Sequence, residues 1–188
     1  MCGIAGYFNP DQNYAENPKQ NFHTLSRMIN TMNHRGPDTY GHTIINSCCL
    51  AHTRLSIIDL ENGRQPMSYT KDGNTYYIVY NGEIYNYKEV KKTLLRKNYT
   101  FETNSDTEVI IAAFCHYGPG FVKELNGIFA IAIYDSMRNT LYLYRDRFGV
   151  KPLYYTKTGD TLVFASRIDT LFEYPRVRPC IDMNSFNE

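Results

Sequence analysis

Strand-like segments follow one another directly along much of this chain, and their order restricts the folds that it can adopt. Residues 1–8 begin the chain as an apolar strand, and two further strands flank a turn at residues 72–74. The expected strands beyond residue 8 are 48–58, 75–80, 128–134, 140–144, 153–156 and 161–165. Because strands and helices do not alternate strictly, a doubly wound parallel sheet is excluded. We expect antiparallel sheets covered by helices.

Helices are predicted where apolar residues recur three or four positions apart. In residues 18–33 the apolar face consists of Phe22, Leu25, Met28, Ile29 and Met32, and in residues 87–97 of Val90, Leu94 and Leu95. A third helix opens at a capping box, in which Ser105 accepts from the Glu108 N–H while the Glu108 side chain reaches back, and it ends near Gly118. A short helix over residues 168–172 follows the hairpins.

The composition is that of one domain with an ordinary core, since 43% of the 188 residues are hydrophobic. A net charge of +1 without blocks of like charge predicts neither nucleic acid nor membrane as a partner. The five cysteines lack metal-binding spacing and no signal segment is visible, so we expect a cytoplasmic protein with reduced thiols. The histidines are scattered, and no metal site is expected.

Cys2 directly follows the initiator methionine, whose removal would leave a thiol and a free α-amine on one residue. The α-amine has a pKa of roughly 7.7–8.0 and a thiol roughly 8.5, so the amine can accept the thiol proton at neutral pH. This combination predicts a nucleophile with its own base. Taken alone, Cys2 is better explained by chance or as a small buried apolar residue, so the other motifs must decide.

Arg54 interrupts an otherwise apolar strand. A guanidinium there is costly unless it meets an anion, and its planar fork matches a carboxylate. Either a ligand carboxylate or an internal salt bridge to Asp59 or Glu61 would satisfy it, and the sequence around Arg54 alone favours the internal salt bridge.

Asn81 and Gly82 stand at the end of a predicted strand, where Asn-Gly usually signals a hairpin turn. The flanking segments do not form a clean hairpin, because a helix is expected from Tyr87. An asparagine amide beside a glycine N–H also supplies two donors aimed at one point, as an oxyanion hole requires. The local sequence is compatible with both a turn and an oxyanion hole.

Asp106 lies in the first turn of the helix that opens at Ser105, where a carboxylate favours the positive end of the helix dipole. That structural role suffices to explain it, although an acidic group there could also receive a substrate ammonium. Residues 145–155 concentrate charge, glycine and proline and predict a solvated turn, and the common phosphate-binding patterns are absent.

Six motifs in a fixed order strongly resemble the glutaminase domain of glutamine-hydrolysing asparagine synthetases, which are class II glutamine amidotransferases of the N-terminal-nucleophile hydrolase superfamily. They are residues 1–4 (MCGI), 34–38 (HRGPD), 54–59 (RLSIID), 81–86 (NGEIYN), 105–108 (SDTE) and 145–155 (RDRFGVKPLYY). The resemblance runs from Cys2 to about Leu171. It implies a glutaminase domain over residues 1–172 and, over residues 173–188, a linker stub toward a missing synthetase domain.

The resemblance implies a role for each matching residue. Cys2 would attack the δ-carbonyl of glutamine and form a thioester, and the Asn81 side chain and Gly82 N–H would hold the oxyanion. Arg54 would bind the α-carboxylate, while Asp106 and Glu83 would receive the α-ammonium. The backbone of Leu55, Ser56, Ile57 and Ile58 would line the site. Arg35 would order a lid near Cys2.

The fold implied by the resemblance is a four-layer αββα sandwich of two antiparallel sheets. Its partners would be L-glutamine and the chain's own synthetase domain, which would make asparagine from aspartate. ATP and Mg are expected only in that missing half, since the chain has no Ser-Gly-Gly-x-Asp-Ser loop, and no cofactor is expected in this domain. Residues 166–169 (SRID) depart from the family's Ser-Glu-x-Lys and leave the acceptor open.

Three alternatives remain. The missing half could aminate an acceptor other than aspartate, such as a peptide or cell-wall carboxylate. The domain could be a non-catalytic scaffold, although the presence of Cys2, Arg54, Asn81, Gly82 and Asp106 argues against this. An unrelated amidase acting on a lactam or bile-salt amide would not need both Arg54 and Asp106.

Overall fold

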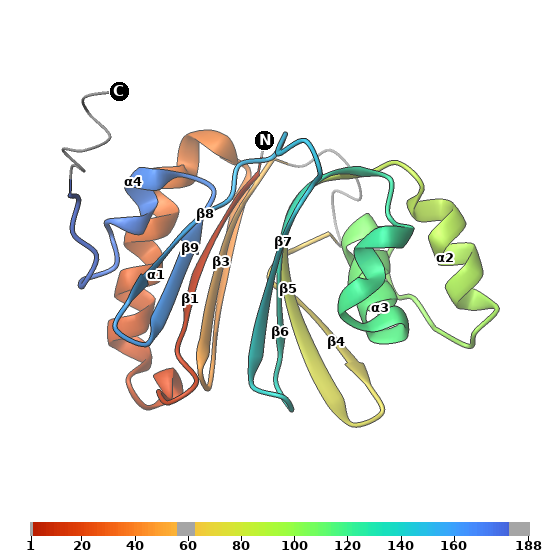
Figure 1. The fold of residues 1–188 in the computed structure, drawn as a ribbon, viewed down its shortest axis with the longest axis horizontal. Coiled ribbons are helices and arrows are strands. Elements are labelled where there is room, and N and C mark those ends of the chain that lie inside the picture. The colour runs from red at the N-terminus through yellow and green to blue at the C-terminus, as the bar shows by residue number, and fades with distance from the viewer. Residues whose placement is uncertain (1, 56–62, 181–188) are drawn as a thin grey trace.

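Two antiparallel sheets stacked between two helical layers form the fold, as Figure 1 shows for the computed structural model. The structure describes residues 2–55 and 63–180. One sheet has the order β2-β3-β1-β9-β8 and the other β4-β5-β6-β7. The αββα arrangement predicted from the resemblance is therefore confirmed.

The strands of the first sheet are β1 (Gly3–Phe8), β2 (Thr39–Ile45), β3 (Cys48–Arg54), β8 (Tyr154–Thr158) and β9 (Thr161–Ala165). Those of the second are β4 (Met67–Lys71), β5 (Asn74–Ile84), β6 (Gly127–Asp135) and β7 (Thr140–Arg145). All paired strands are antiparallel, so short turns and hairpins can join them.

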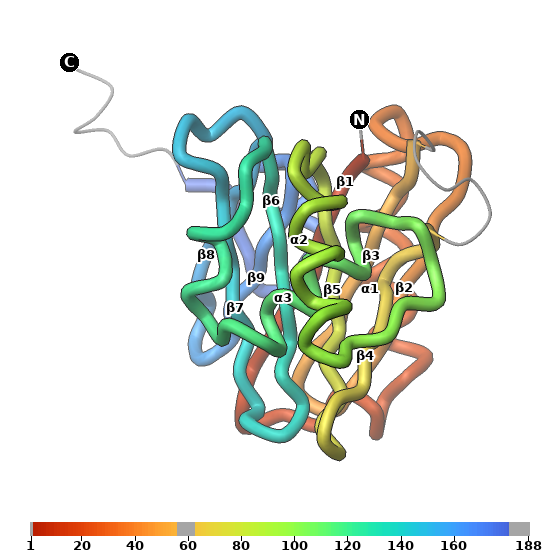
Figure 2. Tube along the Cα trace, turned by 90° about the vertical axis from the view of Figure 1, so that its right-hand side faces the viewer, coloured from red at the N-terminus to blue at the C-terminus, as the bar shows by residue number. Residues whose placement is uncertain are grey.

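The helices segregate to the two outer faces. The helices α1 (Pro18–Met32) and α4 (Ile168–Leu171) cover the first sheet, and α2 (Tyr87–Leu95) and α3 (Asp106–Tyr117) cover the second (Figures 1 and 2). Three short 3-10 helices are η1 (Tyr14–Glu16), η2 (Asn33–Arg35) and η3 (Gly118–Glu124). No helix of the described residues is long and apolar enough to cross a bilayer.

Three apolar cores hold the layers together. One lies between the sheets and includes Ile4, Leu50, Val79 and Phe164, and each of the other two lies between a sheet and its helices. Because side chains alternate along a strand, residues two positions further along share a face. Cys2, His52 and Asn81 therefore belong to the inter-sheet face set by Ile4, Leu50 and Val79.

Several element boundaries differ from the prediction. The strand expected over 48–58 ends at Arg54 among the described residues, and the one expected over 75–80 extends from Asn74 to Ile84. The strands β2 and β4 were not predicted, because their exposed and half-buried residues lack a continuous apolar run.

Two local details were also predicted wrongly. Ser105 Oγ caps the Thr107 N–H at 3.1 Å, whereas the Glu108 carboxylate binds the Glu102 and Thr103 N–H groups at 2.8 and 2.7 Å instead of closing a capping box. Phe22 and Leu95, expected on buried helix faces, are exposed, since the helices contact their sheets along a narrower stripe.

Asp146 organises the loop between β7 and β8. Its Oδ2 accepts from the Phe129 and Lys151 N–H groups at 3.2 and 3.1 Å, and its Oδ1 from Phe148 and Val150 at 3.1 and 3.0 Å. Burial alone would raise the pKa of Asp146, but these hydrogen bonds outweigh it and leave the pKa below its ordinary value. The segment predicted as a solvated turn is thus tied to the second sheet.

We expect Asp146→Asn to lower the free energy of unfolding at pH 7 by about 1–3 kcal/mol, because an amide group would face backbone donors. Urea denaturation measures this, with the exposed Asp160→Asn as control. The folded-state pKa is depressed, so the carboxylate stabilises the protein above its unfolded pKa and this stability is lost as the pH falls through the folded pKa. Equal stability of Asp146→Asn and wild type at pH 7 would contradict the role.

Candidate active site

A cavity of about 140 Å³ opens at one end of the two sheets and gathers most of the predicted site residues. Those that line it are Cys2, Arg54, Leu55, Asn81, Gly82, Glu83 and Asp106. Ser56, Ile57 and Ile58 lie outside the described residues, as do Asp59 and Glu61. The cavity is also lined by Gly63, Gln65, Tyr80, Ser105, Thr107 and Lys151, which were not predicted as site residues.

The Cys2 thiol is half-buried and held by the backbone of one residue. The Leu55 N–H donates to Cys2 Sγ at 3.4 Å, and Sγ lies 3.6 Å from the Leu55 carbonyl. Arg35 Nε donates to the Cys2 carbonyl at 3.1 Å, which fixes the residue from the η2 side. The thiol is therefore held in a fixed place at the end of the cavity, as a nucleophile requires.

Arg54 ends β3 and is only 5% exposed. The Asp38 N–H donates to its carbonyl at 3.1 Å, so the loop at residues 36–38 runs against the end of the strand. Gly36 permits this approach, because a Cβ there would lie 2.5 Å from the Arg54 nitrogen. The arginine is positioned by sheet and loop together.

Asn81 and Gly82 lie inside β5, paired with Ala130 and Phe129, so the turn considered for them is wrong. Glycine is needed because a Cβ on Gly82 would lie 2.2 Å from the Ile128 carbonyl oxygen. Asn81 is 2% exposed, and its Nδ2 has no hydrogen-bond partner among the described residues. A buried amide donor without an acceptor is costly, and a ligand oxygen would relieve that cost.

The backbone N–H of Gly82 also faces the cavity side. In an antiparallel sheet, N–H groups two residues apart point to the same edge. The Tyr80 N–H donates to Gln65 Oε1 at 2.6 Å and the Ile84 N–H to Asp106 Oδ2 at 3.3 Å, both on the edge away from β6. Gly82 lies between them, so its N–H and the Asn81 amide can approach one ligand atom.

Asp106 is 6% exposed and contacts β5. Its Oδ2 accepts from the Tyr80 hydroxyl at 2.8 Å and from the Ile84 N–H. Burial raises the pKa of Asp106, and these hydrogen bonds oppose the rise. Asp106, the half-buried Glu83 and Arg54 all line the cavity, so both acidic and basic groups are present there.

His52 was missed, although it stands two positions before Arg54 and shares its face of β3. It is 1% exposed, and burial lowers its pKa to about 3, so the ring is neutral at physiological pH. The Tyr80 backbone opposes part of this lowering of the pKa, and the ring Nε2 has no hydrogen-bond partner among the described residues. The period-two spacing from Arg54 was the signal that could have found it.

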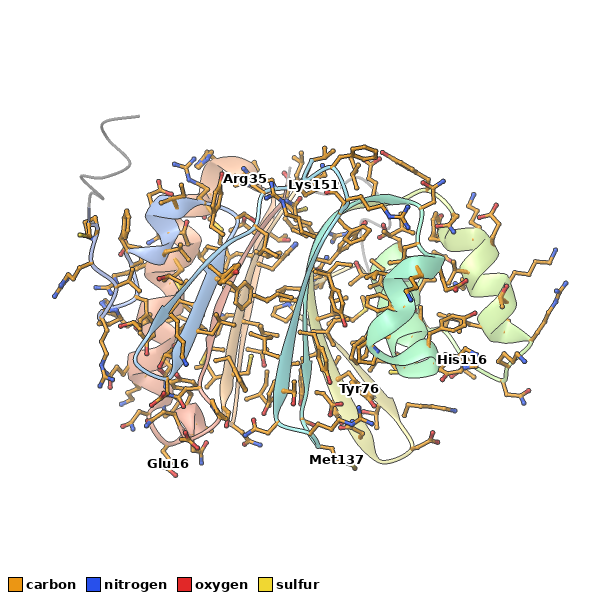
Figure 3. All side chains as sticks on the ribbon, viewed as in Figure 1. Glu16, Arg35, Tyr76, His116, Met137 and Lys151 are labelled. Atoms are coloured by element: carbon orange, nitrogen blue, oxygen red, sulfur yellow. The ribbon has the colours of Figure 1, made fainter. Side chains whose placement is uncertain are left out.

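Lys151 was also missed, because residues 145–155 were predicted as a solvated turn. It is 9% exposed, it lines the cavity, and its N–H donates to Asp146 Oδ2. Figure 3 shows Lys151 and Arg35 at the same end of the molecule, above the sheets. In the part of the chain that the structure describes, no cluster of three His, Cys, Asp or Glu residues could hold a metal ion.

The sequence model of a protein family described as a glutamine amidotransferase domain matches residues 1–188 of this chain. The chain is 39% identical over 188 residues to glutamine-hydrolyzing asparagine synthetase 3 of Bacillus subtilis, which covers 100% of this chain and 30% of that protein. It is 45% identical over 175 residues to glutamine-hydrolyzing asparagine synthetase 2 of the same organism, covering 93% of this chain and 23% of that protein.

A solved glutamine phosphoribosylpyrophosphate amidotransferase from B. subtilis has a similar fold, with a TM-score of 0.66 and 19% identity. The match covers 90% of this chain and 42% of that one. The chain thus spans 23–30% of the length of the two synthetases to which it is similar.

We expect Asp106→Asn to be at least as stable as wild type at pH 7, since the amide oxygen keeps an acceptor for Tyr80 and Ile84. Because folding raises the pKa of Asp106 above its ordinary value of 3.8, the wild-type free energy of unfolding falls as the pH rises from 3.8 through the folded pKa. The Asp106→Asn variant has no carboxyl group at this position and should not show this fall. Urea unfolding at several pH values tests this, with the exposed Asp11→Asn as control. A clear loss of stability at pH 7 would show that the Asp106 charge stabilises the fold.

Proposed function

Because the chain belongs to the glutamine amidotransferase family, we propose that it hydrolyses L-glutamine to glutamate and ammonia at the Cys2 site. The observation that carries the proposal is the convergence of the Cys2 thiol, the unpartnered Asn81 amide and the edge-facing Gly82 N–H on one cavity. A nucleophile beside two donors is the arrangement that acyl transfer requires.

The reaction would begin when Cys2 Sγ attacks the side-chain carbonyl carbon of glutamine. The Asn81 amide and Gly82 N–H would stabilise the negative oxygen of the tetrahedral intermediate. With Met1 removed, the Cys2 α-amine would take the thiol proton and return it to the departing nitrogen, releasing ammonia and leaving a thioester. Water would then cleave the thioester to glutamate and regenerate the thiol.

The two ends of the substrate backbone match the charges of the cavity. Arg54 would bind the α-carboxylate through its guanidinium, and Asp106 with Glu83 would bind the α-ammonium. Burial makes the Asp106 charge unfavourable, so a substrate cation would relieve part of that cost. This arrangement selects a free amino acid over a simple amide.

The ammonia would serve an ATP-dependent synthetase region that makes asparagine from aspartate. The support for this acceptor is the similarity to two glutamine-hydrolyzing asparagine synthetases that are much longer than this chain. ATP and Mg would bind in that region of the full-length protein, outside residues 1–172, and residues 173–188 would lead toward it.

We expect Cys2→Ala to abolish glutamate release from glutamine, because no other nucleophile would replace the thiol. In the full-length protein, added ammonium salts should still support asparagine formation from aspartate and Mg-ATP. Glutamate and asparagine are measured by chromatography, with Cys180→Ser as a control at an exposed thiol. Unchanged glutamate release from Cys2→Ala would refute the mechanism, and failure to aminate aspartate would refute the acceptor.

Asn81→Ala and Arg54→Ala should affect different kinetic constants. Loss of one oxyanion donor typically costs about 2.7–4 kcal/mol, so Asn81→Ala should lower kcat roughly 10²–10³-fold with little change in KM. Arg54→Ala should mainly raise KM through loss of the carboxylate contact. Steady-state kinetics, with circular dichroism to establish folding, distinguishes them. A folded Asn81→Ala with wild-type kcat would remove Asn81 from the mechanism.

A further inference from the structure

The strand β5 is longer than its outer neighbour β4. The register between them ends at Met67 opposite Ile78, whereas β5 continues to Ile84. At this end of β5, the backbone N–H groups of the odd-numbered residues point toward β6. The Tyr85 N–H, for example, donates to the Asn126 carbonyl at 2.8 Å. The N–H groups of Tyr80, Gly82 and Ile84 therefore point to an edge that β4 does not cover.

Side chains replace the missing strand at two of these three positions. Gln65 Oε1 accepts from the Tyr80 N–H at 2.6 Å, and Asp106 Oδ2 accepts from the Ile84 N–H at 3.3 Å. Gly82 lies between these two hydrogen-bonded positions, and it lines the cavity.

The Gln65 side chain is itself fixed at its other end. Its Nε2 donates to Thr107 Oγ1 at 3.2 Å, so one amide group connects the edge of β5 to the first turn of α3. Its backbone is packed tightly, because a Cβ on Gly41 would lie 2.1 Å from the Gln65 carbonyl oxygen. Gln65 therefore meets β5 in a defined orientation.

We propose that Gln65 is a positioning residue for the oxyanion hole: it holds the Tyr80 N–H in place of a strand partner and thereby sets the direction of the Gly82 N–H and the Asn81 amide. The proposal rests on the proposed function. Gln65 would not touch the reacting atoms. Its effect would pass through two residues of backbone, where a small displacement of donors is expensive for catalysis.

A merely structural role makes different predictions. If Gln65 only stabilised the fold, its loss would lower the free energy of unfolding and disturb substrate binding and thiol reactivity together. A positioning role predicts that kcat falls while KM and the intrinsic reactivity of the thiol stay close to wild type. It also predicts weaker binding of a ligand that forms a tetrahedral adduct with Cys2.

The test compares Gln65→Met, which keeps the side-chain length but removes the acceptor, with Gln65→Glu, which keeps an acceptor oxygen. Gln20→Met on the exposed surface of α1 is the control. We expect kcat for glutamine hydrolysis to fall about tenfold or more in Gln65→Met, with KM within about threefold of wild type. Gln65→Glu should retain more of the wild-type kcat than Gln65→Met.

Two probes of Cys2 separate positioning from general damage. Alkylation by iodoacetamide develops no oxyanion, so its rate should stay within about twofold of wild type. The γ-aldehyde of glutamate forms a tetrahedral adduct, so its inhibition constant should rise by about the same factor as kcat falls. Alkylation that slows in parallel with kcat, or a Gln65→Met variant with wild-type kcat, would overturn the proposal.

Amide hydrogen exchange measured by NMR gives a readout that does not need turnover. The Tyr80 N–H should exchange faster in Gln65→Met than in wild type, and unchanged exchange would overturn the proposal even in an inactive protein. Wild type that fails to hydrolyse glutamine would refute the proposed function instead.

If Gln65→Met does not fold, Thr107→Val serves as the second variant, because it removes only the partner of the Gln65 Nε2 group. We expect a smaller fall in kcat in Thr107→Val than in Gln65→Met. A wild-type kcat in Thr107→Val would overturn the proposal.

Discussion

The unpaired edge of β5 is the constraint on which the candidate site depends. A backbone donor at the edge of a sheet must find another partner or water. Here Gln65 and Asp106 satisfy the donors of Tyr80 and Ile84, and Gly82 stands between them. Among the described residues, the Gly82 N–H is thus the one donor of these three without a hydrogen-bond partner, and the bonds to Tyr80 and Ile84 on either side fix the backbone that carries it.

The packing of the two sheets explains why the nucleophile faces that gap. Cys2, His52 and Asn81 occupy the inter-sheet face at the end of strands from both sheets, where the apolar core formed around Ile4 and Val79 gives way to polar residues. Each side chain is directed by strand alternation and not by a flexible loop. A site built on strands holds its donors more rigidly than one built on loops.

Features with local causes could be predicted from the sequence, whereas those that depend on tertiary contacts could not. The helix start at Ser105 and the hairpins of the last third have local signals, and they occur as expected. The Asn81-Gly82 pair suggested a turn because Asn-Gly is a local turn signal. Glycine is needed at position 82 for a tertiary reason, since a Cβ there would clash with the Ile128 carbonyl oxygen on the neighbouring strand. No local sequence pattern predicts the role of Gln65, since its hydrogen-bond partners lie 15 and 42 residues away along the chain.

The charges around the cavity bear on how Cys2 could lose its proton. Burial lowers the pKa of His52 and keeps its ring neutral at physiological pH. Within residues 2–55 and 63–180, the hydrogen-bond partners of Cys2 Sγ belong to the Leu55 backbone, so no histidine or carboxylate contacts the thiol as a base. An amine on the same residue needs no such neighbour, because its distance from the thiol is fixed by covalent geometry. This is consistent with the proposed mechanism, in which removal of Met1 would free the α-amine of Cys2 to act as the base and the surrounding side chains would bind and orient the substrate.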